Sequence, residues 1–265
     1  LIKVIMRKFT SKIYKIIKFI ARLKVSFEIK QNILRSLFNL PKYFSTRRSW
    51  LRKGGKIDKE FLMLHDFYSE SGLCSGDYFH QDLLVANFIY KKNPIRHIDV
   101  GSRIDGFVSH VASFRKIVVL DIRPLSIKSH ENISFLQADI ISKKNLPKTD
   151  SLSCLHAIEH FGLGRYGDKV NIDGHLIALK NLISMVEKGG TFYLSCPLSN
   201  KNQVHFNSQR VFHPGFIPNL KIVKENLKII RFDYINEEGD LLSERQYSEF
   251  FNNNYGCGIY TFKKI

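Results

Sequence analysis

From about residue 90, short apolar runs rich in β-branched residues alternate with segments of helical periodicity. The predicted strands are residues 96–100, 116–122, 133–140, 151–158 and 191–196. Helical spacing marks residues 104–114 and 171–188, and Gly189-Gly190 follows the second segment where a helix stop is expected. Buried strands separated by helices predict an α/β fold with a doubly wound, mostly parallel, Rossmann-like sheet. Ligands of such sheets bind beyond the carboxyl ends of the strands.

The C-terminal part of the chain extends this pattern differently. Residues 227–235 and 258–264 are strand-like runs with no obvious helix between them, which predicts an antiparallel pair at the edge of the sheet. A length of 265 residues suits one main domain with an appendage. We therefore predict an N-terminal arm over residues 1–54 and a Rossmann-like domain over residues 55–265.

The arm carries most of the net charge. Of a total of +17, residues 1–54 contribute +14, from fifteen Lys or Arg against one acid, Glu28. Apolar residues from Ile2 to Leu23 recur at helical spacing and predict a basic amphipathic helix. Such a helix suits the surface of an anionic membrane, and the alternative is ordinary packing on the main domain. Nucleic acid is the least favoured partner, because the aromatic residues are not interleaved as a stacking platform requires.

Cellular location is predicted from two absences in the sequence. There is no apolar block of signal-peptide type and no run of spanning length. The four cysteines are scattered, which favours neither a disulfide framework nor a cysteine zinc site. We therefore expect a cytoplasmic protein, peripheral at the inner face of the membrane if the arm binds there.

Acidic residues end three successive predicted strands. Asp99 is followed closely by Gly101, whose lack of a side chain permits a tight turn and close approach to a ligand. Asp121 lies twenty residues beyond Gly101, where it is placed to accept hydrogen bonds from ribose hydroxyls. Asp139 ends the third strand, where a carboxylate suits an exocyclic adenine amine. An acid at one strand end is usually a turn former, but the three together indicate a nucleoside site.

These residues resemble those of class I S-adenosylmethionine-dependent methyltransferases. More specifically, the chain is similar to a methyltransferase-related family of unknown function with members in bacterial surface-polysaccharide gene clusters. The segments that carry this resemblance are "YFHQDLLVANFI", "RHIDVGSRIDGFVSHVASFRKIVVLDIRPL", "FLQADI", "EHFGLGRYGD" and "VHFNSQRVFHP", within residues 78–264.

The resemblance implies S-adenosylmethionine as cofactor, held at Asp99, Gly101, Asp121 and Asp139, with Ser102 in the same loop. The first loop departs from the D-x-G-x-G-x-G pattern of the class, because Arg103 stands where the second glycine is expected. Arg103 then contacts either the methionine carboxylate or the loop itself.

The string His156-x-x-Glu159-His160 also matches the order of ligands in inverted zinc peptidases. Such a site needs both histidines on one helix, whereas strand-like residues precede His156 and two glycines follow His160. We therefore predict no metal. In the methyltransferase interpretation His160 is the general base, Glu159 orients it or binds the acceptor, and Asp168 is an alternative base. The alternatives for His160 and Glu159 are a structural histidine and a helix-start acid.

Two loops are predicted to contact the substrate. Residues 162–168, "GLGRYGD", form a glycine-hinged loop whose Arg165 and Tyr166 face the substrate, or else an ordinary turn. Residues 197–210 follow the fifth strand and supply His205, Asn207 and Arg210, with Phe206 and Phe212 as stacking surfaces. His80 and Asp82 are further candidates near the cofactor.

The combined prediction is an O-methyltransferase that acts on a sugar hydroxyl of a surface polysaccharide or its lipid-linked precursor. Two alternatives remain open at the level of sequence: an RNA methyltransferase whose arm binds phosphate, and a non-catalytic scaffold that retains the fold.

Overall fold

The computed structural model describes residues 38–126, 130–142 and 144–265. The predicted amphipathic helix lies in residues outside this part of the chain. The chain divides into two compact units, residues 1–73 and 74–265, so the predicted boundary at residue 54 falls inside the first unit.

In the first unit, the described residues form helix α3 (Leu40–Arg52) and a short 3₁₀ turn, η1 (Asp66–Tyr68). Pro41 stands in the first turn of α3, where a missing N–H costs nothing. Trp50 donates from Nε1 to the carbonyl of Lys56, and Arg47 pairs with Glu60, so α3 is tied to the segment that follows it.

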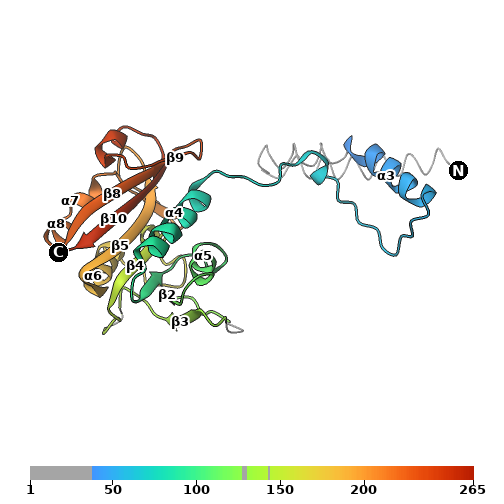
Figure 1. The fold of residues 1–265 in the computed structure, drawn as a ribbon. Helices are drawn as coiled ribbons and strands as arrows, with labels where there is room; N and C mark the ends of the chain where they lie inside the picture. Colours follow the sequence, from blue (N-terminus) through green and yellow to red (C-terminus); the bar gives the residue numbers. More distant parts are fainter. Residues whose placement is uncertain (1–37, 127–129, 143) are drawn as a thin grey trace. The chain divides into compact units, whose positions relative to one another are not determined.

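The second unit is built on an eight-stranded sheet in the order β3-β2-β1-β4-β5-β10-β8-β9 (Figure 1). The first five strands in this order are parallel. They are β3 (Ile133–Gln137), β2 (Ile117–Asp121), β1 (His97–Val100), β4 (Thr149–Leu155) and β5 (Val186–Leu198). From β1 the strand order runs through β2 to β3 on one side and through β4 to β5 on the other. The topological switch point therefore lies between β1 and β4.

The predicted antiparallel C-terminal pair is confirmed. Strand β8 (Leu227–Ile235) pairs antiparallel with β10 (Gly256–Lys264), and β10 pairs antiparallel with β5. The short strand β9 (Leu241–Leu242) adds a further antiparallel partner beside β8. The chain therefore has an α/β fold with a mostly parallel, Rossmann-like sheet and antiparallel C-terminal strands.

Helices cover both faces of the sheet. One apolar cluster joins the sheet to helix α4 (Asp77–Lys92) and to α5 (Ser109–Ala112). The other joins it to α6 (Gly174–Met185), α7 (Phe216–Asn219) and α8 (Lys221–Asn226). Alternate residues of β5 belong to the two clusters, with Tyr193 in the first and Phe192 in the second, as expected for a strand buried on both faces.

Two expected element boundaries are wrong. The helix predicted over 171–188 spans only Gly174–Met185, because Val186 is already extended and begins β5. Gly189-Gly190 therefore lies within β5, where the pairing with β4 shifts register, and does not end the helix. The helix predicted over 104–114 is split into a π-helical turn, η2 (Ile104–Val108), and α5, since Gly106 has a non-helical backbone.

The second unit also contains three short elements in its loops. They are the 3₁₀ turn η3 (Ile158–His160), the hairpin of β6 (Gln203–His205) with β7 (Gln209–Val211), and the 3₁₀ turn η4 (Tyr247–Phe250). None of the described helices is long and apolar enough to cross a membrane.

Candidate functional site

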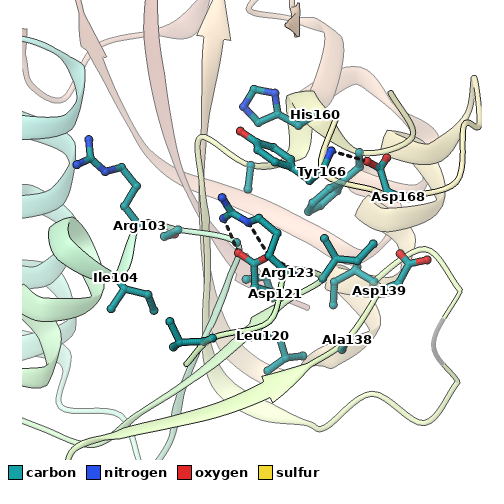
Figure 2. A pocket seen from close by; sticks show the side chains of 18 of the residues that line it. Arg103, Ile104, Leu120, Asp121, Arg123, Ala138, Asp139, His160, Tyr166 and Asp168 are labelled. Atoms are coloured by element: carbon teal, nitrogen blue, oxygen red, sulfur yellow. Dashed lines mark hydrogen bonds and ion pairs between the residues drawn. The ribbon is translucent and has the colours of Figure 1, made fainter. Parts of the chain in front are cut away.

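A cavity of about 540 Å³ lies at the carboxyl ends of the parallel strands (Figure 2). Its volume lies within the range of small-molecule sites in proteins. Loops after β1, β2, β3 and β4 line it, so Gly101, Asp121 and Asp139 of the predicted nucleoside site lie around one cavity, whereas Asp99 does not line it. The predicted site residues in its lining are Gly101, Ser102, Arg103, Asp121, Asp139, His160, Tyr166 and Asp168.

The loop after β1 is held by a buried carboxylate. Asp99 is fully buried, and it accepts from the backbone N–H of Ser102 at 3.0 Å, from Ser102 Oγ at 2.6 Å and from Ser153 Oγ at 2.5 Å. Burial raises the pKa of Asp99 to about 6, against the lowering effect of these hydrogen bonds. Asp99 is absent from the cavity lining, so it shapes the loop from behind.

Gly101 makes the turn of this loop possible. Its φ is +77°, in the left-handed region, and a Cβ there would lie 2.9 Å from Ala157 Cβ. A side chain would therefore press the β1 loop away from the β4 loop. Positive φ and the close approach of Ala157 both explain why a glycine occupies position 101.

Arg103 lines the cavity, and its guanidinium points away from Asp121 and Arg123 (Figure 2). It donates from Nη2 and Nε to Asp105 at 3.0 and 3.2 Å, and its guanidinium lies 5.3 Å from the centroid of the Tyr78 ring. The side chain is more than half exposed. The position where the class has its second glycine is therefore occupied here by an exposed, positively charged side chain that lines the cavity.

Asp121, at the end of β2, points into the cavity and is engaged by a neighbour. Arg123 donates from Nη2 to Asp121 Oδ2 at 2.6 Å and from Nε to Oδ1 at 3.0 Å (Figure 2). The guanidinium of Arg123 also lies 4.6 Å from the centroid of the Tyr166 ring. The carboxylate expected to hold a ribose is thus bound by an arginine two residues along the chain.

Strand β3 ends at Gln137, so Asp139 lies in the loop after the strand and not at its end as predicted. Its carboxylate turns toward its own loop, away from Asp121 (Figure 2). Oδ1 accepts from the backbone N–H of Ile141 at 2.9 Å, and Oδ2 accepts from Ser142 Oγ at 2.7 Å. This is the turn-forming role of an Asp. The cavity wall at this end is apolar and includes Leu120, Phe135, Ala138, Ile140 and Ile141.

His156 and Glu159 form a buried contact directly after β4. His156 has a φ of +48°, which is strained for a residue with a side chain, and its Nδ1 lies 3.1 Å from Glu159 Oε1. Its Nε2 lies 3.2 Å from Cys257 Sγ. Burial lowers the pKa of His156, but the charges of Glu159, Asp77 and Asp82 outweigh burial and leave this pKa raised.

Glu159 is completely buried and short of donors. Its Oε1 also lies 3.8 Å from His160 Nε2. Among the described residues, neither carboxylate oxygen has a well-aligned hydrogen-bond partner, so the approach of His156 is an electrostatic contact. Glu159 is absent from the cavity lining. Its carboxylate therefore lies behind His156 and His160, both of which line the cavity.

His160 lines the cavity and is oriented by the β6-β7 hairpin. Its Nδ1 lies 2.8 Å from the carbonyl oxygen of Ser208, which only accepts, so Nδ1 carries the proton. Burial lowers the pKa of His160. The ring is therefore neutral at pH 7, with Nε2 as its unprotonated nitrogen.

Residues 162–168 form a loop organised by Asp168. Its Oδ2 accepts from the N–H groups of Gly162 at 2.8 Å and Gly164 at 3.1 Å, and its Oδ1 accepts from Tyr166 N at 3.2 Å. These bonds occupy the carboxylate that the sequence offers as an alternative base. Asp168 thus holds the loop that presents Tyr166, whose ring stands edge-on to His160 with centroids 5.4 Å apart.

Arg210 differs from its expected position. Its side chain is buried and donates to the carbonyl oxygens of Phe161 at 2.7 Å, Ile172 at 3.2 Å and Glu159 at 3.3 Å. It clamps the loop after β4 and does not face the cavity. Phe212 is likewise buried, within the apolar core.

Other predicted residues lie around the site without lining it. His205 and Asn207 are exposed in the β6-β7 hairpin, Asn207 at a φ of +56° in its turn, and Phe206 between them is also exposed. Asp82 is buried in α4, where Gln81 donates to it at 2.9 Å. Neither His80 nor Asp82 belongs to the cavity lining.

Three contributors to the site were not predicted from the sequence: Tyr78, Arg123 and the carbonyl of Ser208. Arg123 carried a signal, because a basic residue two positions after a strand-end acid is within reach of it. Tyr78 lies at the start of α4, a helix whose bounds the sequence analysis did not define. A backbone carbonyl such as that of Ser208 leaves no sequence signal.

Comparison with known proteins bears mainly on the fold. Residues 109–236 match a family described as Caenorhabditis protein of unknown function, DUF268. No curated protein sequence matches the chain. Among solved structures, N-methyltransferase NodS from Bradyrhizobium japonicum WM9, in complex with S-adenosyl-L-homocysteine, is similar with a TM-score of 0.50 at 14% identity. That alignment covers 71% of this chain and 88% of NodS.

Coclaurine N-methyltransferase, bound to N-methylheliamine and S-adenosylhomocysteine, is similar over 97% of this chain and 94% of that enzyme. Its TM-score is 0.51 at 8% identity. At these identities the likeness concerns the fold: both solved structures share the Rossmann-like architecture with this chain.

Proposed function

We propose that this protein is an S-adenosylmethionine-dependent methyltransferase. The observation that carries the proposal is the cavity at the topological switch point, where the Gly101 turn and the Asp121 carboxylate meet two histidines. The fold that surrounds it is shared with methyltransferases whose structures contain S-adenosylhomocysteine. Fold alone does not fix function, so the proposal depends on these site residues.

The residues present fit such a cofactor. Asp121 supplies acceptor oxygens for ribose hydroxyls, and the apolar wall from Leu120 to Ile141 suits an adenine ring. Gly101 allows the β1 loop to pack against the β4 loop at the cavity wall, where a Cβ would strike Ala157, another lining residue. Arg103 offers an exposed guanidinium for the methionine carboxylate, in place of the glycine usual in the class. Asp139 contributes through the loop it folds.

When bound, this cofactor supplies an electrophilic methyl group. The chain must then align an acceptor and remove its proton. Nδ1 of His160 is committed to Ser208, so Nε2 is the atom that takes the proton. The lowered pKa of His160 keeps Nε2 unprotonated at neutral pH. Glu159 is a positioning residue, because its buried charge faces both histidines.

We further propose that the acceptor is a sugar hydroxyl of a surface polysaccharide or its lipid-linked precursor. The exposed side chains of His205, Phe206 and Asn207, in the hairpin that also holds His160, offer polar groups and a stacking surface for a sugar. The basic arm over residues 1–54 would hold the enzyme at the inner face of the membrane. The cofactor-binding domain in this proposal is residues 55–265.

The test is acceptor-dependent formation of S-adenosylhomocysteine from S-adenosylmethionine. With an accepted glycan, His160→Gln is expected to lower kcat about 10²- to 10⁴-fold, the range of a general base, while cofactor affinity stays unchanged. Lys221→Gln, an exposed change on α8, is the matched control. A His160→Gln enzyme with wild-type kcat would remove His160 from the mechanism. Cofactor binding without turnover on any glycan would favour a scaffold.

A further inference from the structure

Three guanidinium groups lie over the rings of Tyr78 and Tyr166, two tyrosines that line the cavity, although Arg165 itself is not a lining residue. Arg103 lies over Tyr78, while Arg123 and Arg165 share the ring of Tyr166, at 4.6 and 5.0 Å from its centroid. All three arginines are at least partly exposed. Two cations held on one ring repel each other unless anions lie near them.

The charges of Arg123 and Arg165 are balanced very differently. Arg123 is paired with Asp121 through two side-chain hydrogen bonds. Arg165 donates from Nη1 to the neutral carbonyl of Ser208 at 3.0 Å. Over the described ranges, no carboxylate lies within ion-pair distance of Arg165. The nearby acid Asp168 uses its oxygens on backbone N–H groups of its own loop.

The pairing of Arg123 conflicts with the role proposed for Asp121. A carboxylate that accepts from ribose hydroxyls has fewer acceptor positions for an arginine. Binding of the cofactor at Asp121 would therefore weaken the Arg123 contact. Arg123 and Arg165, both within 5.0 Å of the Tyr166 ring centroid, would then both lack a fully engaged carboxylate partner.

We propose that Arg123 and Arg165 form an oxyanion subsite on Tyr166, which binds a phosphate or carboxylate group of the methyl acceptor. This inference rests on the proposed function and refines it: the acceptor is an acidic sugar. It also predicts positive coupling, because a ligand that draws Asp121 away from Arg123 makes Arg123 available for the anion. By linkage, the anion must tighten cofactor binding by the same factor.

The experiment is an NMR titration of the whole chain with three probes: glucose 6-phosphate, glucuronate and glucose. Each titration is run with and without saturating S-adenosylhomocysteine. We expect the nucleoside to tighten binding of at least one anionic probe by about five- to tenfold, within the usual range of coupling between sites. Glucose should show no such change. The anionic probe with the larger coupling identifies the acceptor group as phosphate or carboxylate.

Variants separate the subsite from general attraction to a basic protein. Arg123→Gln should abolish the coupling, and Arg165→Gln should weaken anion binding both with and without the nucleoside. Arg245→Gln is the matched control, since Arg245 is also 47% exposed and paired with a carboxylate, Glu249, but lies away from the cavity. It should leave both quantities unchanged.

Two results would overturn the inference while leaving the proposed function intact. In the first, S-adenosylhomocysteine binds, but the anionic probes bind equally well with and without it. In the second, Arg123→Gln and Arg165→Gln behave like Arg245→Gln, which would show that any anion binding is unspecific. Failure of the folded protein to bind the nucleoside at all, measured separately by calorimetry, would overturn the proposed function and this inference together.

Discussion

At the scale of single residues, the electrostatic centre of the site is the carboxylate of Glu159. It is completely buried, and the nitrogens of His156 and His160 are its charged or chargeable neighbours within 4 Å among the described residues. A buried carboxylate without hydrogen-bond donors is costly, so its retention points to an electrostatic role. That role is to raise the proton affinity of both histidines.

Glu159→Gln is therefore expected to lower the pKa values of His156 and His160. The buried surroundings remain, while the charge that opposes desolvation is removed. Titration of the histidine ring signals by NMR measures both values. Glu187→Gln, a change at an exposed acid in β5, is the control and should shift neither. An unchanged pKa for His156 in Glu159→Gln would contradict this account.

His97 provides a pH-dependent contribution to stability outside the cavity. It is buried between Ser151 Oγ at 2.8 Å and Ser153 Oγ at 3.1 Å. Burial lowers its pKa from 6.5 to about 3. Between these values the unfolded chain binds a proton that the folded chain excludes. The free energy of unfolding should therefore fall as the pH falls from 6.5 toward 3.

The slope from this one residue is at most about 1.4 kcal/mol per pH unit. Asp99, whose pKa is raised to about 6, acts in the opposite direction between its ordinary value and pH 6. Asp99 is present in both the wild type and His97→Gln, so its contribution to the pH dependence cancels when the two proteins are compared. Urea unfolding at several pH values should show a flatter dependence in the variant. If the free energy of unfolding changed with pH equally in both proteins, His97 would not be the group that excludes a proton in the folded chain.

Residues at the cavity were predicted correctly from the sequence where their positions follow from the ends of buried strands. Gly101 and Asp121 lie at the cavity as predicted from their positions after buried strands. Arg210 and Asp168 were predicted to act on substrate or proton, yet their polar atoms bond to backbone groups of the loop. Sequence cannot distinguish these uses, because a polar side chain that organises a loop and one that binds a ligand have the same composition.

At the scale of elements, the loop of residues 162–168 is the most constrained part of the site. Gly162 and Gly167 both have positive φ, at +79° and +82°. A Cβ at Gly162 would lie 2.2 Å from the carbonyl oxygen of Asn171, whereas a Cβ at Gly167 would meet nothing within 4 Å. The two positions therefore share the backbone strain and differ in the steric clash.

Alanine at these two positions separates strain from clash. Gly167→Ala should cost about 1 kcal/mol of stability, from left-handed backbone strain alone. Gly162→Ala should cost about 2–4 kcal/mol, because the clash with Asn171 adds to the strain. Thermal or urea unfolding gives both values. Equal losses would show that the contact between Gly162 and residue 171 is not rigid.

Elements with strong periodicity were predictable from the sequence, and those defined by tertiary contacts were not. The apolar runs of β1 and β2 were located closely, and the antiparallel pairing of β8 with β10 was predicted, whereas β3 ends at Gln137, before its predicted end at residue 140. The end of α6 was misjudged because Gly189-Gly190 resembles a helix stop, but β5 already begins at Val186. The hairpin of β6 and β7 has strands of only three residues, too short for a periodic signal.

At the scale of the whole molecule, charge and chemistry are divided along the chain. Residues 1–54 hold +14 of the net charge of +17, whereas the cavity is formed by residues of the second unit. This division fits an enzyme that a basic segment brings to an anionic surface, as we propose. We propose that the cavity of the second unit binds S-adenosylmethionine through Asp121.

Calorimetric titration of S-adenosylmethionine into the whole protein tests this claim most directly, with Asp121→Ala and Arg123→Ala as paired variants. Both variants remove the same ion pair, so they differ in whether the carboxylate is present. We predict that the wild type binds, that Arg123→Ala binds at least as tightly, and that Asp121→Ala loses tenfold or more, about 1.4 kcal/mol. Equal loss in both variants would assign Asp121 a structural role, and no binding to the folded wild type would contradict methyl transfer itself.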